Sequence, residues 1–171
     1  MQRQRVVLSA LLMGIMLGMG GREAAAGAKD EAAIRALEQR FAAAVKAKDV
    51  NALMRVYVPD ESLLVFDVIP PRQYVGAKAY RQDWESLFAA FPGPIDTFEI
   101  TELHIMAEGT LGVSHSIQHL VLTDKAGKKV DLTVRVTDGY RKTKGKWLIT
   151  HEHVSVPVDL ATGKADLASK P

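Results

Sequence analysis

RVTDGYRKTKGKWLITHEHVS, residues 135–155, is the stretch that decides the fold. Two runs rich in β-branched and aromatic residues flank a Lys144-Gly145 turn, which is the pattern of a β-hairpin with strands at 130–142 and 147–156. Towards the N-terminus, residues 111–123 and 97–107 have the same strand-like composition and are separated by turn residues. The alternation slips between Ile100 and Leu103, which predicts a bulge that bends the strand. The second half of the chain is therefore expected to form a meandering, bent antiparallel sheet.

Helical patterns dominate the first half of the chain. Residues 30–48 place apolar side chains at helical spacing, residues 50–57 predict a second short helix, and residues 76–91 predict a third. A short strand is expected at 62–68, before the Pro70-Pro71 pair. Helices followed by an antiparallel sheet define an α+β layout.

The N-terminus has the three-part plan of a secretory signal peptide, residues 1–28. Arg3 and Arg5 precede an apolar run that is too short and too rich in glycine for a spanning helix, and small residues end at Ala28. Cleavage is expected after Ala28 or after Ala26, and the cut after Ala28 would leave 143 residues with 19 Lys and Arg against 19 Asp and Glu. We therefore expect a periplasmic or secreted protein with neither a nucleic-acid nor a membrane partner. The mature chain divides into a domain at 29–156 and an extended tail at 157–171.

Four phrases, in this order, resemble the nuclear transport factor 2-like superfamily of cone folds. They are QRFAAAVKAKDVNALMRVY, YVPDESLLVFD, PRQYVGAKAYRQDW and RVTDGYRKTKGKWLITHEHVS. Within the superfamily the chain is similar to the exported SnoaL-like, ketosteroid-isomerase-homologue proteins, over residues 31–157. The resemblance implies three N-terminal helices packed on a strongly bent, mostly antiparallel β-sheet that encloses a pocket. It also implies a homodimer formed through the opposite sheet face.

The resemblance to ketosteroid isomerases can be carried over residue by residue. Their general base is an aspartate at the end of the first strand, and Asp67 in LVFDV matches it. A second aspartate, kept protonated, donates to the enolate oxygen, and Asp138 in TDGY matches it. The third member is a tyrosine, where this chain has Phe41. Because one lost donor of this kind costs about 2.7–4 kcal/mol, a related proton transfer is favoured over steroid isomerisation itself.

The tripeptide His151-Glu152-His153 lies on the last predicted strand, so its histidines face one side and Glu152 faces the other. A metal site would need a third imidazole from His115 or His119, and the family pattern has no such triplet. The histidines are therefore assigned to a sheet face or an interface, and no metal is expected. A bulge at the preceding turn would reverse the parity, which makes Glu152 and His153 mutually exclusive candidates for the pocket.

The predicted site has three catalytic candidates: Asp67 as the base, Asp138 as the neutral donor and His119 as an assisting group. Its predicted ligand contacts are Tyr57, Tyr80, Trp84, Val136, Glu152 and His153.

Two functions fit these residues. The first is an exported small-molecule-binding domain that acts on a partly apolar carbonyl ligand, with proton-transfer catalysis (isomerase, cyclase or dehydratase) that needs no cofactor. The second is a non-catalytic dimerisation or protein-interaction module whose cavity is vestigial. The sequence has no glycine-rich motif for binding a dinucleotide or a nucleotide phosphate, and it has no cysteine that could act as a nucleophile.

Overall fold

A computed structural model describes residues 5–169, with side chains from residue 26 onwards. Six strands form one sheet in the order β2-β1-β6-β5-β4-β3, and β1 pairs with β6 in the parallel sense while the other pairs are antiparallel. The helices are α1 (Arg5–Ala47), α2 (Val50–Met54) and α3 (Ala77–Ala90). The strands are β1 (Leu64–Phe66), β2 (Tyr74–Val75), β3 (Ile95–Glu108), β4 (Leu111–Thr123), β5 (Lys129–Thr143) and β6 (Lys146–Ser155).

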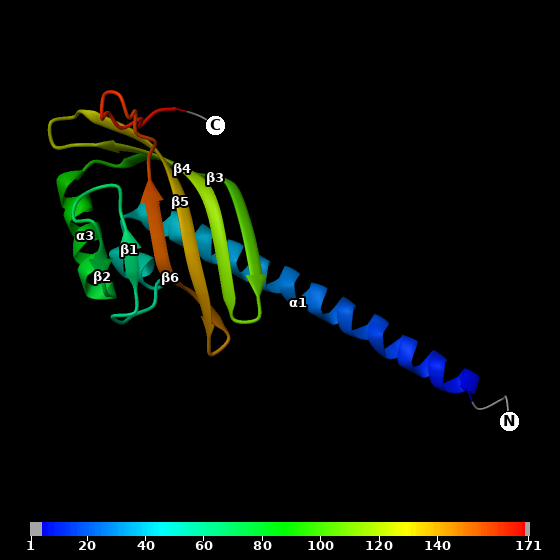
Figure 1. Cartoon of the computed structure of the whole chain (residues 1–171). Coiled ribbons are helices and arrows are strands. Elements are labelled where there is room, and N and C mark those ends of the chain that lie inside the picture. Colours follow the sequence, from blue (N-terminus) through cyan, green and yellow to red (C-terminus); the bar gives the residue numbers. More distant parts are fainter. Residues whose placement is uncertain (1–4, 170–171) are drawn as a thin grey trace.

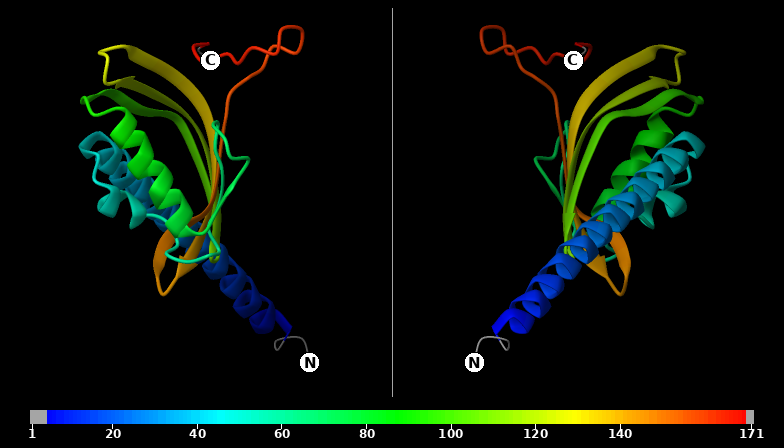
Figure 2. Two further views of the ribbon diagram at one scale, coloured as in Figure 1. Left: turned by 90° about the vertical axis from the view of Figure 1, so that its left-hand side faces the viewer. Right: turned by 90° about the vertical axis from the view of Figure 1, so that its right-hand side faces the viewer.

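The sheet is curved, and all three helices lie on its concave side (Figures 1 and 2). We call this side the inner face and the opposite, helix-free side the outer face. The predicted α+β cone is therefore confirmed. The predicted signal peptide lies almost wholly outside the residues whose side chains are described. Within those residues, no helix is both long and apolar enough to cross a membrane.

A β-bulge bends β3 where the alternation of the sequence slips. The register with β4 shifts between Thr101 and His104, and Glu102 adopts a positive φ of 49°. An extra residue on one strand increases its local bend and twist. The predicted bulge between Ile100 and Leu103 is thus confirmed.

Helix α1 packs along β3 and closes the core through Ile34, Leu37, Phe41 and Val45, all of which are buried. Gly112 on β4 allows this close approach. A Cβ atom built at Gly112 would lie 2.8 Å from Cδ1 of the fully buried Ile34 and 3.3 Å from the carbonyl oxygen of Met106, so the Ile34 side chain would have to shift within a close-packed core. The glycine therefore sets the distance between helix and sheet.

The second helix is shorter than its sequence predicts. The pattern predicts helix to Tyr57, but α2 ends at Met54. The backbone of Val56 and Val58 then exchanges hydrogen bonds with Ile149 of β6, each 2.9 Å long. β-Branched and aromatic residues fit this extended pairing better than another helical turn. The helical assignment of Tyr57 was therefore wrong, and its correction brings the tyrosine beside β6.

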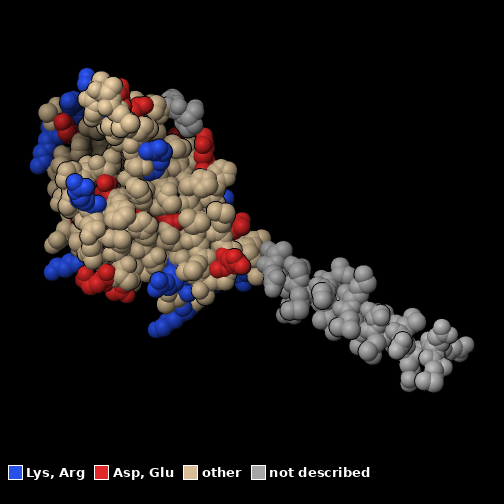
Figure 3. Space-filling view, in the orientation of Figure 1, with Lys and Arg blue, Asp and Glu red and all other residues tan. Residues whose placement is uncertain are grey.

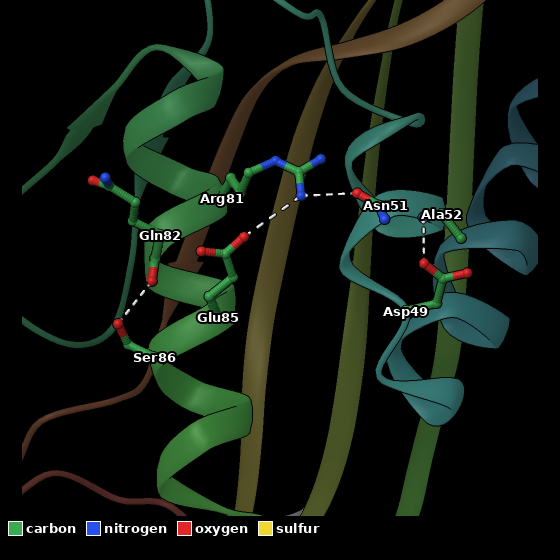
Figure 4. Close-up of polar contacts among 7 residues, drawn as sticks. All are labelled: Asp49, Asn51, Ala52, Arg81, Gln82, Glu85 and Ser86. Atoms are coloured by element: carbon green, nitrogen blue, oxygen red, sulfur yellow. Dashed lines mark hydrogen bonds and ion pairs between the residues drawn. The ribbon is translucent and has the colours of Figure 1, made fainter.

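Surface contacts link α2 to α3 (Figure 4). Asp49 caps α2 by accepting a hydrogen bond of 2.8 Å from the amide of Ala52. Arg81 of α3 donates to Asn51 at 3.0 Å and pairs with Glu85 at 3.6 Å. Because such exposed pairs are worth about 0–1 kcal/mol, they orient the helices more than they stabilise them. On the face drawn in Figure 3, acidic and basic side chains are interspersed.

The tail turns back on itself and then joins the sheet. Val158 and Ala165 form an antiparallel bridge, and the carbonyl of Leu167 accepts a hydrogen bond of 2.8 Å from the amide of Thr133. Strand β6 pairs with β5 only as far as the Arg135–Ser155 partners, so Thr133 lies beyond the end of β6. The tail thus supplies a partner to an otherwise open edge of β5.

We expect Gly112→Ala to destabilise the fold by about 1–3 kcal/mol, because the new methyl group overpacks the contact between α1 and β4. Urea unfolding would measure the loss. Gly139→Ala is the matched control on β5, since a Cβ atom there has its nearest neighbour at an ordinary 3.5 Å. Equal stability of the two variants would show that α1 is not held at this distance by the glycine.

Candidate functional site

A small cavity of about 130 Å³ lies between α3, the segment after β1 and the inner face of the sheet. Its walls are largely apolar and include Phe41, Trp84, Leu87, Phe98, Leu120 and Val134. Four ionisable side chains also line it: Asp67, Tyr80, Asp83 and Glu152. An apolar pocket with a few convergent polar groups is the usual form of a ligand site.

The described residues also form a wider groove of about 830 Å³ between α1, α2 and the turn before β6. Its floor is mostly alanine. Its charged groups, Arg40, Asp49, Arg55 and Lys146, are all exposed and therefore remain solvated. The smaller cavity is the better candidate for chemistry, because its carboxyl groups are removed from water.

Glu152 faces the cavity because of a second bulge, between β5 and β6. The turn sets Thr143 opposite Lys146, and an uninterrupted ladder would bring His151 opposite Asp138. Instead the register shifts by one residue after Tyr140, so Glu152 is the partner of Asp138. One extra residue reverses the parity of everything beyond it. It turns Glu152 inward and leaves His151 and His153 facing outward.

Two tyrosines hold the carboxyl group of Glu152. The hydroxyl of Tyr57 donates to Oε2 at 2.7 Å, and the hydroxyl of Tyr80 donates to Oε1. Glu152 is 3% exposed. Burial raises its pKa to about 7, although the two phenolic hydrogen bonds act in the opposite direction. Glu152 is thus poised to exchange a proton near neutral pH.

Asp67 reaches the same cavity from the end of β1. Val65 is the parallel partner of Glu152, and Asp67 follows two residues later on the same side. Burial raises the pKa of Asp67 to about 6. A hydrogen bond of 2.6 Å from the amide of Val68 lowers that pKa, and the neighbouring Asp83 carboxyl raises it. The cavity therefore holds two carboxyl groups whose pKa values lie close to neutrality.

A second layer of buried polar groups lies behind Glu152. Tyr140 donates to Oε1 of Glu38 at 2.8 Å, contacts the hydroxyl of Ser114 at 2.7 Å and lies 3.4 Å from Oδ2 of Asp138. Burial raises the pKa of Glu38 to about 7. Burial, then the neighbouring Glu152 and Glu38, raise the pKa of Asp138 well above its usual range. Both acids are therefore expected to be neutral in the folded protein below pH 7.

The structure brings together only part of the predicted site. Asp67, Tyr80, Trp84 and Glu152 line the cavity. Asp138, Tyr57 and Val136 are buried but do not line the cavity. His119 bonds Asp131 on the outer face at 2.9 Å, and His153 is exposed on that same face beside Phe66. Neither histidine is placed to act on a ligand in the cavity, because the sheet separates the outer face from the cavity.

Two buried polar atoms have no hydrogen-bond partner among the described residues. They are Nε1 of Trp84 and Oδ1 of Asp138. A buried donor without a partner is costly and is expected to meet a ligand or a water molecule. Because Trp84 lines the cavity, its indole is a candidate donor to a bound molecule.

The network partners Glu38, Tyr140 and Ser114 were missed from the sequence. One signal was present for Glu38, which lies four residues after Ile34 and three before Phe41, within the apolar stripe of α1. An acid in such a stripe marks a buried carboxyl. Ser114 carries no comparable signal, because a serine fits either face of a strand.

The fold and the cavity are those of a cone-shaped domain that can enclose a small ligand beside buried carboxyl groups. Comparison with known families agrees, since residues 34–159 match the SnoaL-like domain. The chain belongs to this family. No curated protein matches it.

Solved structures extend the comparison. A nuclear transport factor 2-like protein of unknown function from Pseudomonas putida KT2440 is 32% identical, with a TM-score of 0.75 over 84% of this chain and 98% of that one. A ketosteroid isomerase-like protein from Erwinia carotovora atroseptica is 20% identical, with a TM-score of 0.63 over 74% and 95% of the two chains. A nuclear transport factor 2-like superfamily protein from Salmonella enterica serovar Typhimurium is 15% identical, with a TM-score of 0.70 over 80% of this chain and 97% of that one. The last two likenesses concern the fold alone.

We expect Glu38→Gln to reduce the dependence of stability on pH. Glu38 is protonated in the folded protein up to about pH 7, whereas its usual pKa is 4.5. Between these values the unfolded chain releases a proton that the folded protein keeps, so the free energy of unfolding falls as pH rises. Between pH 4.5 and about 7, the free energy of unfolding of the glutamine variant should therefore fall by up to roughly 3 kcal/mol less than that of the wild type. Urea unfolding from pH 4.5 to 8 would measure the difference.

The matched control for this experiment is Glu31→Gln, which changes an exposed glutamate on the same helix. It should keep the pH dependence of the wild type. If Glu38→Gln kept it as well, the carboxyl group of Glu38 would be ionised in the folded protein, and its burial would not hold the proton.

Proposed function

We propose that the protein binds a small, partly apolar carbonyl compound in the 130 Å³ cavity and catalyses a proton transfer on it without a cofactor. The observation that carries the proposal is that Asp67 and Glu152 line one apolar cavity with pKa values raised to about 6 and about 7. Catalytic acids and bases are most effective when their pKa values lie near the working pH.

The two carboxyl groups divide into a base and an acid. Near pH 7 Asp67 is largely ionised, while Glu152 is protonated in a large fraction of molecules. Asp67 would take the proton from the carbon next to the carbonyl group and return it to another carbon. Negative charge would develop on the carbonyl oxygen, where the proton of Glu152 and the indole Nε1–H of Trp84 are available donors.

This assignment changes one role suggested by the resemblance. Asp138 was expected to donate directly to the ligand, but it does not line the cavity. Its direct partners are instead Tyr140 and, across the strands, Glu152. We propose that Asp138 acts through Glu152, because a neutral neighbour leaves the pKa of Glu152 lower than a charged neighbour would.

The size of the cavity limits the ligand. A cavity of about 150 Å³ lined by apolar side chains accommodates benzene. The present cavity is close to that volume and therefore suits one ring or a short branched chain. Membership of the SnoaL-like family supports the reaction class, while the volume argues against a polycyclic substrate.

We expect the protein to convert 3-cyclohexen-1-one into its conjugated isomer, a proton shift on a single ring that ultraviolet absorbance follows directly. The rate should rise through about pH 6, as Asp67 ionises, and fall through about pH 7, as Glu152 loses its proton. Asp67→Asn should lower the rate by about 10²-fold or more, because the general base is removed.

Asp131→Asn is the matched control, since this aspartate is exposed on the outer face. Equal rates for the wild type and Asp67→Asn would contradict the assignment of the base. Phenol, a single ring with one hydroxyl group, serves as a binding probe for the cavity. If the wild type neither turned over the enone nor bound phenol, the result would favour the non-catalytic module that the sequence also allows.

We also propose that the protein is exported and that the signal peptide is removed after Ala28. Asp30 supports this boundary, because it accepts hydrogen bonds from Lys142 at 2.6 Å and from Trp147 at 3.1 Å. These contacts anchor the start of the remaining helix to the sheet. N-terminal sequencing of protein recovered from the periplasm or medium should therefore begin at Lys29. An intact Met1 on recovered protein would contradict it.

A further inference from the structure

Two histidines face each other across β3 and β4, on the outer face and away from the proposed cavity. His104 and His115 are direct cross-strand partners, and both are exposed. Their ring centroids lie 5.0 Å apart, with an angle of 21° between the planes. Helices cover only the inner face of the sheet (Figure 2), so no helix of this chain covers the pair.

The bulge in β3 creates this pair. Thr101 lies opposite Ile117, and an uninterrupted ladder would place Leu103 opposite His115. The register shift at Glu102 replaces Leu103 by His104 at that position. Leu103 packs against the core instead. The same backbone feature thus bends the sheet and brings two imidazoles together.

The rings of His104 and His115 make no hydrogen bond and no ion pair within the part of the chain that the structure describes. Two other histidines of β4 and β6 do have polar partners. His119 contacts Asp131 and His151 contacts the carbonyl of Leu64, each at 2.9 Å. A neutral imidazole always offers one nitrogen as an acceptor. The pair therefore presents two uncommitted nitrogen ligands side by side.

We propose that His104 and His115 chelate one divalent transition-metal ion, of the Cu²⁺ or Zn²⁺ class, with water at the remaining positions. Imidazole is a preferred ligand of these ions, at metal–nitrogen distances of about 2.0–2.1 Å. Two ligands of one ion then lie roughly 3 Å apart. Directly opposite residues have Cβ atoms about 4.5–5.5 Å apart, so rotation of the two exposed side chains reaches that separation.

The surroundings set limits on the affinity. Among the described residues there is no group of three or more histidine, cysteine or acidic side chains placed to hold a metal. Arg135, whose partner Ile117 is two residues from His115, adds a positive charge on the same face. The site is therefore expected to exchange its ion readily, with Cu²⁺ bound more tightly than Zn²⁺ by the usual order of affinities.

Titration of the full chain with Cu²⁺, followed by electron paramagnetic resonance, tests the proposal. The wild type should bind one ion through two nitrogen ligands, and an excess of Zn²⁺ should displace it. His104→Ala and His115→Ala should each lower the affinity about tenfold or more and leave one nitrogen ligand, because the second imidazole gains from its high local concentration. Both side chains are exposed, so thermal unfolding of the variants should match the wild type.

His119→Ala and His153→Ala are the matched controls, since both histidines share the outer face but lie outside the pair. They should bind Cu²⁺ as the wild type does. Binding that survives in His104→Ala and His115→Ala, or that falls equally in the controls, would overturn the proposal. Neither result bears on the cavity, whose carboxyl groups are tested by enone isomerisation.

Discussion

The burial of Glu152 between the hydroxyl groups of Tyr57 and Tyr80 is the constraint on which the rest of the site depends. None of the buried charged groups among the described residues is basic, so no ion pair offsets the loss of water around this carboxyl or around Glu38 and Asp138. Under these conditions an acid keeps its proton to higher pH and is satisfied by hydrogen bonds. Ionisation of Glu152 or Glu38 raises the pKa of Asp138 further, because each negative charge makes the next less favourable. The site therefore holds exchangeable protons on side chains that are shielded from bulk solvent, and this property suits proton transfer better than it suits stability.

Two of the three register shifts among the described strands determine which residues face the cavity and which form the histidine pair. In β6 the bulge replaces a histidine by Glu152 opposite Asp138, and in β3 it replaces Leu103 by His104 opposite His115. Each replacement follows from the twofold period of a strand, in which one extra residue exchanges the faces of all that follow. The inner face thereby gains an acid, and the outer face gains an imidazole. Both local groupings depend on backbone geometry as much as on side-chain identity.

The sequence predicts the elements and their order well, because periodicity and turn residues are local properties. Glu152 and His153 could not be separated from the sequence, since the extra residue lies on β6 opposite Gly139 and Tyr140, and no residue of β6 itself marks its position. Asp138 was expected to act as a neutral donor in the pocket, but whether it reaches the cavity depends on how α1 and Tyr140 pack against it. His104 could not be paired with His115 from the sequence, because the alternation of β3 assigns a face only when the position of the extra residue is known.

The hydrogen bond from Tyr140 to Glu38 joins the site to the main helix of the fold. Glu38 lies on the same stripe of α1 as Phe41, the position at which the resemblance to ketosteroid isomerases implies a tyrosine. This chain thus lacks a phenol on the helix but has one on β5 that reaches back to the helix. The phenol of Tyr140 does not line the cavity and instead contacts the carboxyl groups of Glu38 and Asp138. A change in the position of α1 would consequently alter the pKa values of Glu38 and Asp138, and through them that of Glu152. The packing of α1 against the sheet is therefore coupled to the proton affinity of the carboxyl groups in and behind the cavity.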